Sequence, residues 1–88
     1  MGGTTLKPGA GELVPLALVT AGEQVRLARI DAGRGLQGHL ASLGLLPGAV
    51  FTVASGSSHG PVVVAVGESR IALGRGMAHK IMVERIAG

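Results

Sequence analysis

Short runs of mostly aliphatic residues make up most of the chain, and glycine, proline or serine separates them. Such runs are typical of β-strands bounded by turns, because β-branched side chains pack well on a pleated surface. The pattern predicts strands within QVRLARI, AVFTVAS, PVVVAV, SRIAL and KIMVERI. Strands this closely spaced predict a mainly β fold: a small SH3-like antiparallel β-barrel of five to six short strands with one short α-helix.

The first strand changes phase along its length. Val25 and Leu27 would face one side of the sheet, whereas Ile30 falls on the other. An extra residue in one strand restores the alternation, so the pattern predicts a β-bulge or a sharp bend near Ala28.

Helical spacing replaces strand spacing between the first and second strands. Leu36, Leu40 and Leu43 recur every three or four residues, Gly44 can cap a helix at its end, and Pro47 cannot continue it. The segment LVPLALV is expected to lie across one end of the barrel, and GRGMAH is expected to form a single helical or 3₁₀ turn. Residues 1–11 are predicted to be a flexible leader, and residues 12–88 a single domain.

The composition limits the chemistry. The chain has 88 residues, of which 47% are apolar and only 1% aromatic, and it has no cysteine. Disulfides, thiolate metal sites and a cysteine nucleophile are therefore excluded. The first residues lack the features of an export signal, and the longest apolar runs are far shorter than the ~20 residues of a membrane span, so we expect a cytoplasmic protein.

The net charge of +3 is compatible with nucleic acid, anionic lipid or an acidic protein as partner, but its eight lysines and arginines are scattered. Scattered charges are typical of a solvated surface. The run PVVVAV resembles a strand that is covered on both faces, which favours a homo-oligomer or a docked partner over a lone monomer.

The stretch GRGLQG matches the glycine pattern that binds a dinucleotide pyrophosphate. That site also needs a parallel βαβ unit and an acidic residue about 20 positions further on, and the sequence favours neither. We therefore interpret Gly33, Gly35 and Gly38 as residues that let the first strand turn abruptly into the helix.

The three histidines lie on separate elements, with no two of them three or four residues apart, so no metal site and no cofactor are expected. Ser55, Ser57, Ser58 and His59 are interpreted as a serine-rich turn between strands and not as a nucleophile with its base. The sequence thus predicts a protein without enzymatic activity.

The second half of the chain resembles the ferrous iron transport protein A (FeoA) family, in the stretches HLASLGLLPGAVFTVAS, HGPVVVAV and SRIALGRGMAHKIMV. The resemblance runs over about residues 16–86. The matching positions are Leu40, Leu43, Gly44, Leu45, Pro47, Gly48, Gly60, Pro61, Ile71, Ala72, Leu73, Ala78, Ile81 and Val83. Each also has a structural explanation; for example, Leu40 and Leu43 would plug the barrel and Pro47-Gly48 would form the tight turn into the next strand.

The resemblance implies an accessory role in bacterial ferrous iron uptake, through binding to the cytoplasmic GTP-binding portion of the FeoB permease. The protein would then reach the inner face of the membrane only through that partner. The expected docking surface is an apolar corner with a polar rim. Its candidate residues are Arg34, His39, Leu43, Leu45, Pro47 and Arg75.

Two other interpretations remain open. GEQVRLARIDAGRGLQG also resembles a KOW-type element of SH3-like barrels that bind RNA, although the chain has almost no aromatic residues for stacking on bases. The chain could also correspond to the SH3-like domain that ends metal-dependent repressors, but it contains no helix-turn-helix with which to read DNA.

Overall fold

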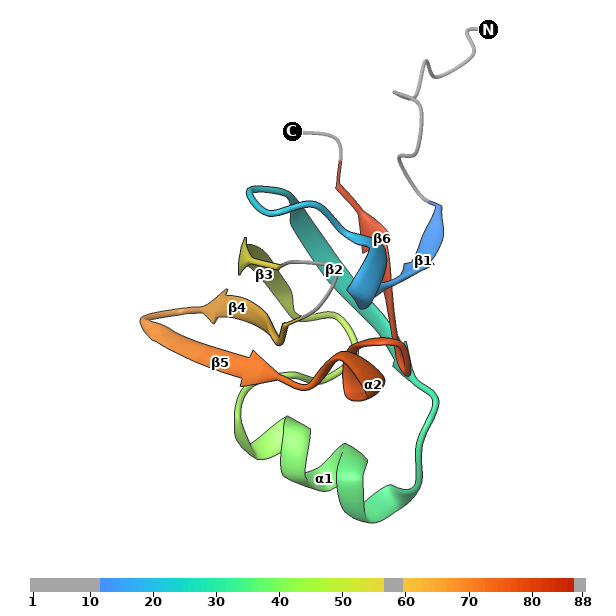
Figure 1. Ribbon diagram of the computed structural model, residues 1–88. Helices are drawn as coiled ribbons and strands as arrows, with labels where there is room; N and C mark the ends of the chain where they lie inside the picture. The colour runs from blue at the N-terminus through green and yellow to red at the C-terminus, as the bar shows by residue number, and fades with distance from the viewer. Residues whose placement is uncertain (1–11, 57–59, 87–88) are drawn as a thin grey trace, which may run out of the picture.

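The computed structural model describes residues 12–56 and 60–86 as a single six-stranded antiparallel sheet with short helical segments (Figure 1). The elements are β1 (Leu13–Pro15), the 3₁₀ helix η1 (Leu16–Leu18), β2 (Gln24–Ile30), α1 (Arg34–Ser42), β3 (Val50–Ser55), β4 (Val62–Val66), β5 (Ser69–Leu73), α2 (Arg75–Ala78) and β6 (Ile81–Arg85). The strand order is β1-β6-β2-β3-β4-β5. This confirms the predicted mainly β, SH3-like fold, whereas the predicted leader, residues 1–11, lies outside the described residues.

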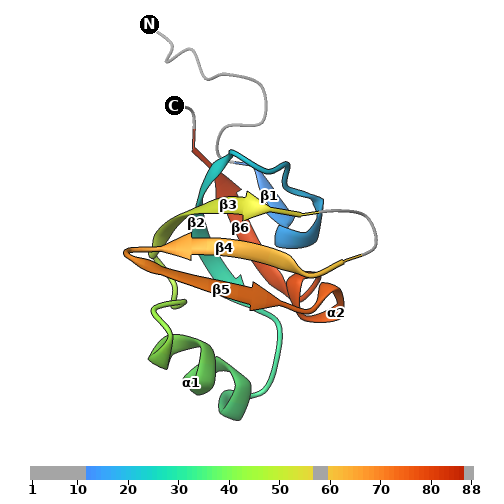
Figure 2. The same cartoon turned by 60° about the vertical axis from the view of Figure 1, so that its left-hand side comes forward.

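The sheet folds over on itself around a small aliphatic core. In Figure 2, β3, β4 and β5 cross in front of β2 and β6, and α1 lies below them. The buried residues among those described are all apolar, and Phe51 is the one aromatic residue with them. The strands β2, β3, β4 and β6 contribute alternate residues to this core, as in Val25 and Leu27 of β2 or Val62 and Val64 of β4.

The predicted bulge in β2 is confirmed. Leu27 pairs with Val83 of β6, but the next pair joins Arg29 to Met82, so Ala28 is the extra residue. The bulge brings Ile30 back to the buried face, where it is 7% exposed. A second register shift lies between Val53 and Ser55 in β3, and the hydrophobic pattern of this strand shows no comparable phase change.

The segment LVPLALV divides into two elements instead of crossing one end as a unit. Residues 13–15 pair with β6 as the edge strand β1, and η1 then turns Leu16 into the core, where its side chain is fully buried. The short helix α2 buries Ala78 in the same way and half-buries Met77, as predicted.

Helix α1 ends in a Schellman motif centred on Gly44. The amide of Gly44 donates to the carbonyl of Ala41 at 2.9 Å, and the amide of Leu45 donates to that of Leu40, also at 2.9 Å. Gly44 has φ +95°, which confirms the predicted glycine cap. The motif reverses the chain and directs Leu45 against the core beside Leu40, so Leu45, and not Leu43 as predicted, is the second plugging residue.

The glycines before and within α1 have ordinary backbone angles. Gly33 caps the helix with φ −66°, Gly35 and Gly38 are helical, and a methyl group on any of the three would meet no atom within 4 Å. The prediction that these glycines permit the turn was therefore wrong. Hydrogen bonds hold the turn instead: the amide of Asp31 donates to the carbonyl of Lys80 (2.7 Å), and Gln37 Nε2 donates to that of Ala32 (2.7 Å).

Candidate partner-binding surfaces

The glycine pattern lies in a fold that does not suit a dinucleotide. The strands on either side of α1, β2 and β3, pair antiparallel, whereas the pyrophosphate site needs a parallel βαβ unit. The helix itself has only nine residues. The strand pairing therefore argues against a dinucleotide site at GRGLQG.

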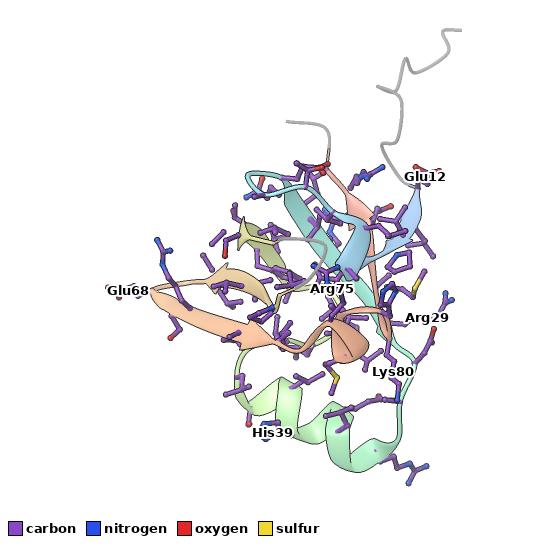
Figure 3. The ribbon with its side chains drawn as sticks, viewed as in Figure 1. Glu12, Arg29, His39, Glu68, Arg75 and Lys80 are labelled. Atoms are coloured by element: carbon purple, nitrogen blue, oxygen red, sulfur yellow. The ribbon has the colours of Figure 1, made fainter. Side chains whose placement is uncertain are left out.

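The histidines described by the structure lie apart from acidic clusters. His39 is exposed on α1, on the side that faces away from the sheet (Figure 3), and His79 is exposed at the end of α2. Within residues 12–56 and 60–86, no group of three or more His, Cys, Asp and Glu residues is placed to hold a metal ion. His59, together with Ser57 and Ser58, falls outside those residues.

The predicted apolar corner exists, but its composition differs from the prediction. Leu43 is 39% exposed and Pro47 is exposed, whereas Leu45 is 0% exposed and belongs to the core. The assignment of Leu45 to a docking surface was therefore wrong, because the Schellman motif turns its side chain inward. Its neighbour Leu46, which the sequence did not single out, is 46% exposed.

The turn after α1 presents these residues rigidly. The amide of Ala49 donates to the carbonyl of Leu46 at 2.9 Å, with Pro47 and Gly48 at the central positions and Gly48 at φ +94°. These are the features of a type II turn, which confirms the predicted Pro47-Gly48 turn. Beyond it, Val50 at the start of β3 is 45% exposed. We call Leu43, Leu46, Pro47 and Val50 the leucine corner.

The two arginines predicted for the rim of this corner lie elsewhere. Arg75 donates to the carbonyls of Gly60 (3.2 Å) and Ala17 (3.1 Å). Because Gly60 comes just before β4, Arg75 is held near the start of that strand. The leucine corner lies at the other end, because a Cβ on Gly44 would be 3.1 Å from Val66 Cγ1. Gly60 and Val66 are six residues apart, so an extended chain at about 3.3 Å per residue places them roughly 20 Å from one another.

Arg34 and His39 occupy different positions relative to the corner. Arg34 begins α1 and is about 13 Å along the helix from Leu43, at 1.5 Å per residue. His39 is four residues before Leu43, and residues at this spacing are neighbours on a helix surface. His39 is therefore the predicted polar residue that adjoins the leucine corner.

Much of the positive charge is neutralised locally. Three arginines form ion pairs with acidic residues on or beside the β1-β6-β2 part of the sheet. The pairs are Arg26–Glu84 (2.8 Å), Arg29–Asp31 (2.9 Å), Arg85–Glu23 (3.3 Å) and Arg85–Glu12 (3.6 Å). Of the other cations in the described part, Arg34, Arg70 and Lys80 have neither an ion pair nor a hydrogen bond from their side chains. This distribution leaves little of the continuous basic face that RNA binding would use.

The β4 strand is buried on one face and half-buried on the other. Val62 and Val64 are in the core, while Val63 and Ala65 point outward and are partly exposed. Their outward neighbours across the ladders include Thr52 and Arg70. The expected homo-oligomer therefore stays a prediction. None of the helices in the part of the chain that the structure describes is both long and apolar enough for a membrane span.

A sequence model of the FeoA domain matches residues 14–85, which include nearly every element described above. The chain belongs to the FeoA family. A curated relative from Methanocaldococcus jannaschii, named "Putative Fe(2+) transport protein A", is 43% identical over 72 residues, which are 82% of this chain and 87% of that protein. The resemblance inferred from the sequence is thereby confirmed.

Solved structures of FeoA proteins have the same fold. A crystal structure of an iron uptake regulatory protein, FeoA, has a TM-score of 0.78 and 34% identity, and the match covers 84% of this chain and 99% of that chain. The solution structure of FeoA from Chlorobium tepidum has a TM-score of 0.74 and 25% identity over 85% of this chain and 72% of that one.

A crystal structure of T. acidophilum IdeR is also similar, with a TM-score of 0.73 and 24% identity, but only 37% of that chain is covered, against 92% of this one. That similarity concerns the fold alone. The FeoA match, and not this similarity, assigns the chain to its family.

Proposed function

We propose that this protein is an accessory protein of ferrous iron uptake that acts by binding the cytoplasmic GTP-binding portion of a FeoB-type permease. Membership of the FeoA family and the relative named for Fe(2+) transport support the iron-uptake role. The action proposed is binding and not catalysis, and it places the protein in the cytoplasm, at the inner face of the membrane through its partner.

The leucine corner is the surface proposed for this contact. Leu43, Leu46 and Val50 are each 39–46% exposed and follow one another around a proline turn that fixes their positions. A rigid apolar cluster loses little conformational entropy on binding, which favours it as the centre of an interface. This exposure of neighbouring aliphatic side chains is the observation that carries the surface assignment.

The test measures binding of the purified chain to the full-length permease of the same organism in detergent, with and without GTP. Leu46→Asp is expected to weaken binding by about tenfold or more, because it places a charge in the centre of the apolar contact. Leu13→Asp is the matched control: Leu13 is 44% exposed but lies in the edge strand β1, which β6 and β2 separate from β3, and the substitution should leave the affinity unchanged. Circular dichroism would verify that both variants are folded.

Equal affinities for the wild type and Leu46→Asp would refute the surface assignment. Failure of the wild type to bind the permease at all would refute the proposed function. A duplex RNA measured at two salt concentrations provides the remaining comparison, because binding to phosphates weakens steeply as salt rises. Salt-sensitive RNA binding without permease binding would favour the KOW-type alternative.

A further inference from the structure

A cavity of about 480 Å³ lies on the side of the barrel that carries η1, at the opposite end of β4 from the leucine corner. Its volume is within the range of about 300–1,000 Å³ that is usual for ligand pockets. The residues that line it are Ala17, Leu18, Val19, Thr20, Ala21, Gly56, Arg75 and His79. We call this cavity the η1 pocket.

Arg75 is held at this pocket with part of its guanidinium unused. Its Nε donates to the carbonyl of Gly60 and its Nη1 to that of Ala17, and these bonds fix the plane of the group. Nη2 has no hydrogen-bond partner in the described part of the chain. It is also not one of the side-chain atoms that are buried without a partner. An arginine oriented in this way can offer its remaining N–H groups to a carboxylate.

The charge around the pocket is positive. No acidic residue is among the lining residues of the described chain, and His79 lies one helical turn after Arg75. Glu23 is an acidic residue that contacts one of the lining residues: its Oε2 accepts a hydrogen bond from the amide of Thr20 at 2.8 Å. Its Oε1 lies 3.3 Å from Arg85 Nε, in an ion pair. That carboxylate is already engaged, so the cation of Arg75 remains available to a ligand.

The wall of the pocket beside Arg75 is aliphatic. It includes Ala17, Leu18 and Ala21, whereas the side chain of Val19 belongs to the core at 7% exposed. Leu18 is 61% exposed, the largest value among the exposed large apolar residues described. An inorganic anion would satisfy Arg75 but leave this wall in water. A ligand that carries a carboxylate and an aliphatic group a few ångströms apart would satisfy both.

We propose that the η1 pocket binds an extended peptide segment of a partner protein in which Asp or Glu stands two residues from Leu, Ile or Val. The carboxylate would accept hydrogen bonds from Arg75, and the aliphatic side chain would pack on Leu18. Residues i and i+2 of an extended peptide lie on the same face, about 7 Å apart. Both side chains can therefore enter one pocket, and the pocket volume admits about two or three side chains. The site is separate from the leucine corner and does not depend on the proposed contact with the permease.

The test uses acetyl-Leu-Ser-Glu-Ser-Leu-amide as the probe, because its Glu and Leu side chains share one face of an extended peptide, and the ¹H–¹⁵N spectrum of the full chain as the readout. The amides of residues 17–21 and Gly56 are expected to shift in a saturable manner. Replacing the Glu residue of the peptide by Gln, or its Leu residues by Ser, should each weaken binding by about tenfold, as expected for loss of a charge-assisted hydrogen bond or of the apolar contact.

Two variants check the surface from the side of the protein. Leu18→Asp should weaken peptide binding by about tenfold or more, whereas Leu46→Asp, the variant designed against the leucine corner, should bind the peptide like the wild type. Arg75→Lys retains the positive charge but not the planar fork, and it is expected to bind several-fold more weakly.

Three results would overturn the proposal: no saturable shift up to about 5 mM peptide, a weakness typical of non-specific contact; equal binding of the Glu and Gln peptides; or shifts confined to residues outside the pocket. Sodium phosphate that shifted the same amides with the same affinity would show a general anion site and would also contradict the peptide assignment. Because the permease assay depends on Leu46 and the peptide assay on Leu18, failure of one proposal is distinguishable from failure of the other.

Discussion

Gly44 provides the sharpest test of how this fold is held together. Its φ of +95° is one that a residue with a Cβ adopts at a cost of about 1–2 kcal/mol. A Cβ added there would also lie 3.1 Å from Val66 Cγ1, a contact closer than nine in ten real Cβ contacts, and we assign about 1 kcal/mol to it. The unfolded chain of an alanine variant loses some freedom, which offsets about 0.4–1 kcal/mol. Gly44→Ala should therefore lower the free energy of unfolding by about 2 kcal/mol.

The measurement is urea and thermal unfolding followed by far-UV circular dichroism, because the chain has no tryptophan or tyrosine for fluorescence. A loss of about 2 kcal/mol corresponds to a decrease in Tm of roughly 10 °C for a domain of this size. Gly38→Ala is the matched control on the same helix. Its φ is helical and its added methyl group meets open space, so it should raise stability by about 0.5–1 kcal/mol.

The two substitutions are chemically identical and are expected to act in opposite directions. An unchanged or higher Tm for Gly44→Ala would refute the description of the Schellman motif and its contact with Val66. A lower Tm for Gly38→Ala would show instead that the exposed face of α1 packs against something that the structure does not include.

Two further predictions concern residues that the sequence placed on the surface. Leu45→Ala should cost about 2–5 kcal/mol of stability because it opens a cavity in the core, while Leu46→Ala next to it should change stability by less than about 0.5 kcal/mol; equal effects in urea unfolding would contradict the inward turn of Leu45. Arg75→Met, which removes the donors to two carbonyls but keeps most of the side-chain volume, should cost about 1–2 kcal/mol, whereas Arg70→Met, an exposed arginine without an ion pair or hydrogen bond in the described chain, should be neutral in the same assay.

The strands β2 to β6 and the helix α1 could be predicted from the sequence because each depends on a local pattern, whereas β1 was not predicted as a strand. Alternation of apolar residues predicts a strand whatever it packs against, and the phase change between Leu27 and Ile30 was enough to locate the bulge at Ala28. Glycine at position 44 and proline at position 47 predicted a cap and a turn, because only certain backbone angles suit these residues. The resemblance of the motifs to the FeoA family followed from the same local features in the same order.

The candidate site was predicted less well, because a docking surface depends on which side chains remain exposed. Leu43, Leu45 and Leu46 are the same residue type within four positions, and periodicity does not separate them once the helix has ended. The Schellman motif rotates the chain so that Leu45 joins the core and Leu46 faces solvent.

The sequence by itself determined the class of fold, the positions of the turns and the family, since these follow from the periodicity and backbone preferences of neighbouring residues. Only the tertiary structure decided which leucine is exposed and where the arginines lie. Arg75 reaches carbonyls 15 and 58 positions away, and such contacts form only when distant segments have packed. For this reason the leucine corner and the η1 pocket became visible as separate surfaces only in the folded chain.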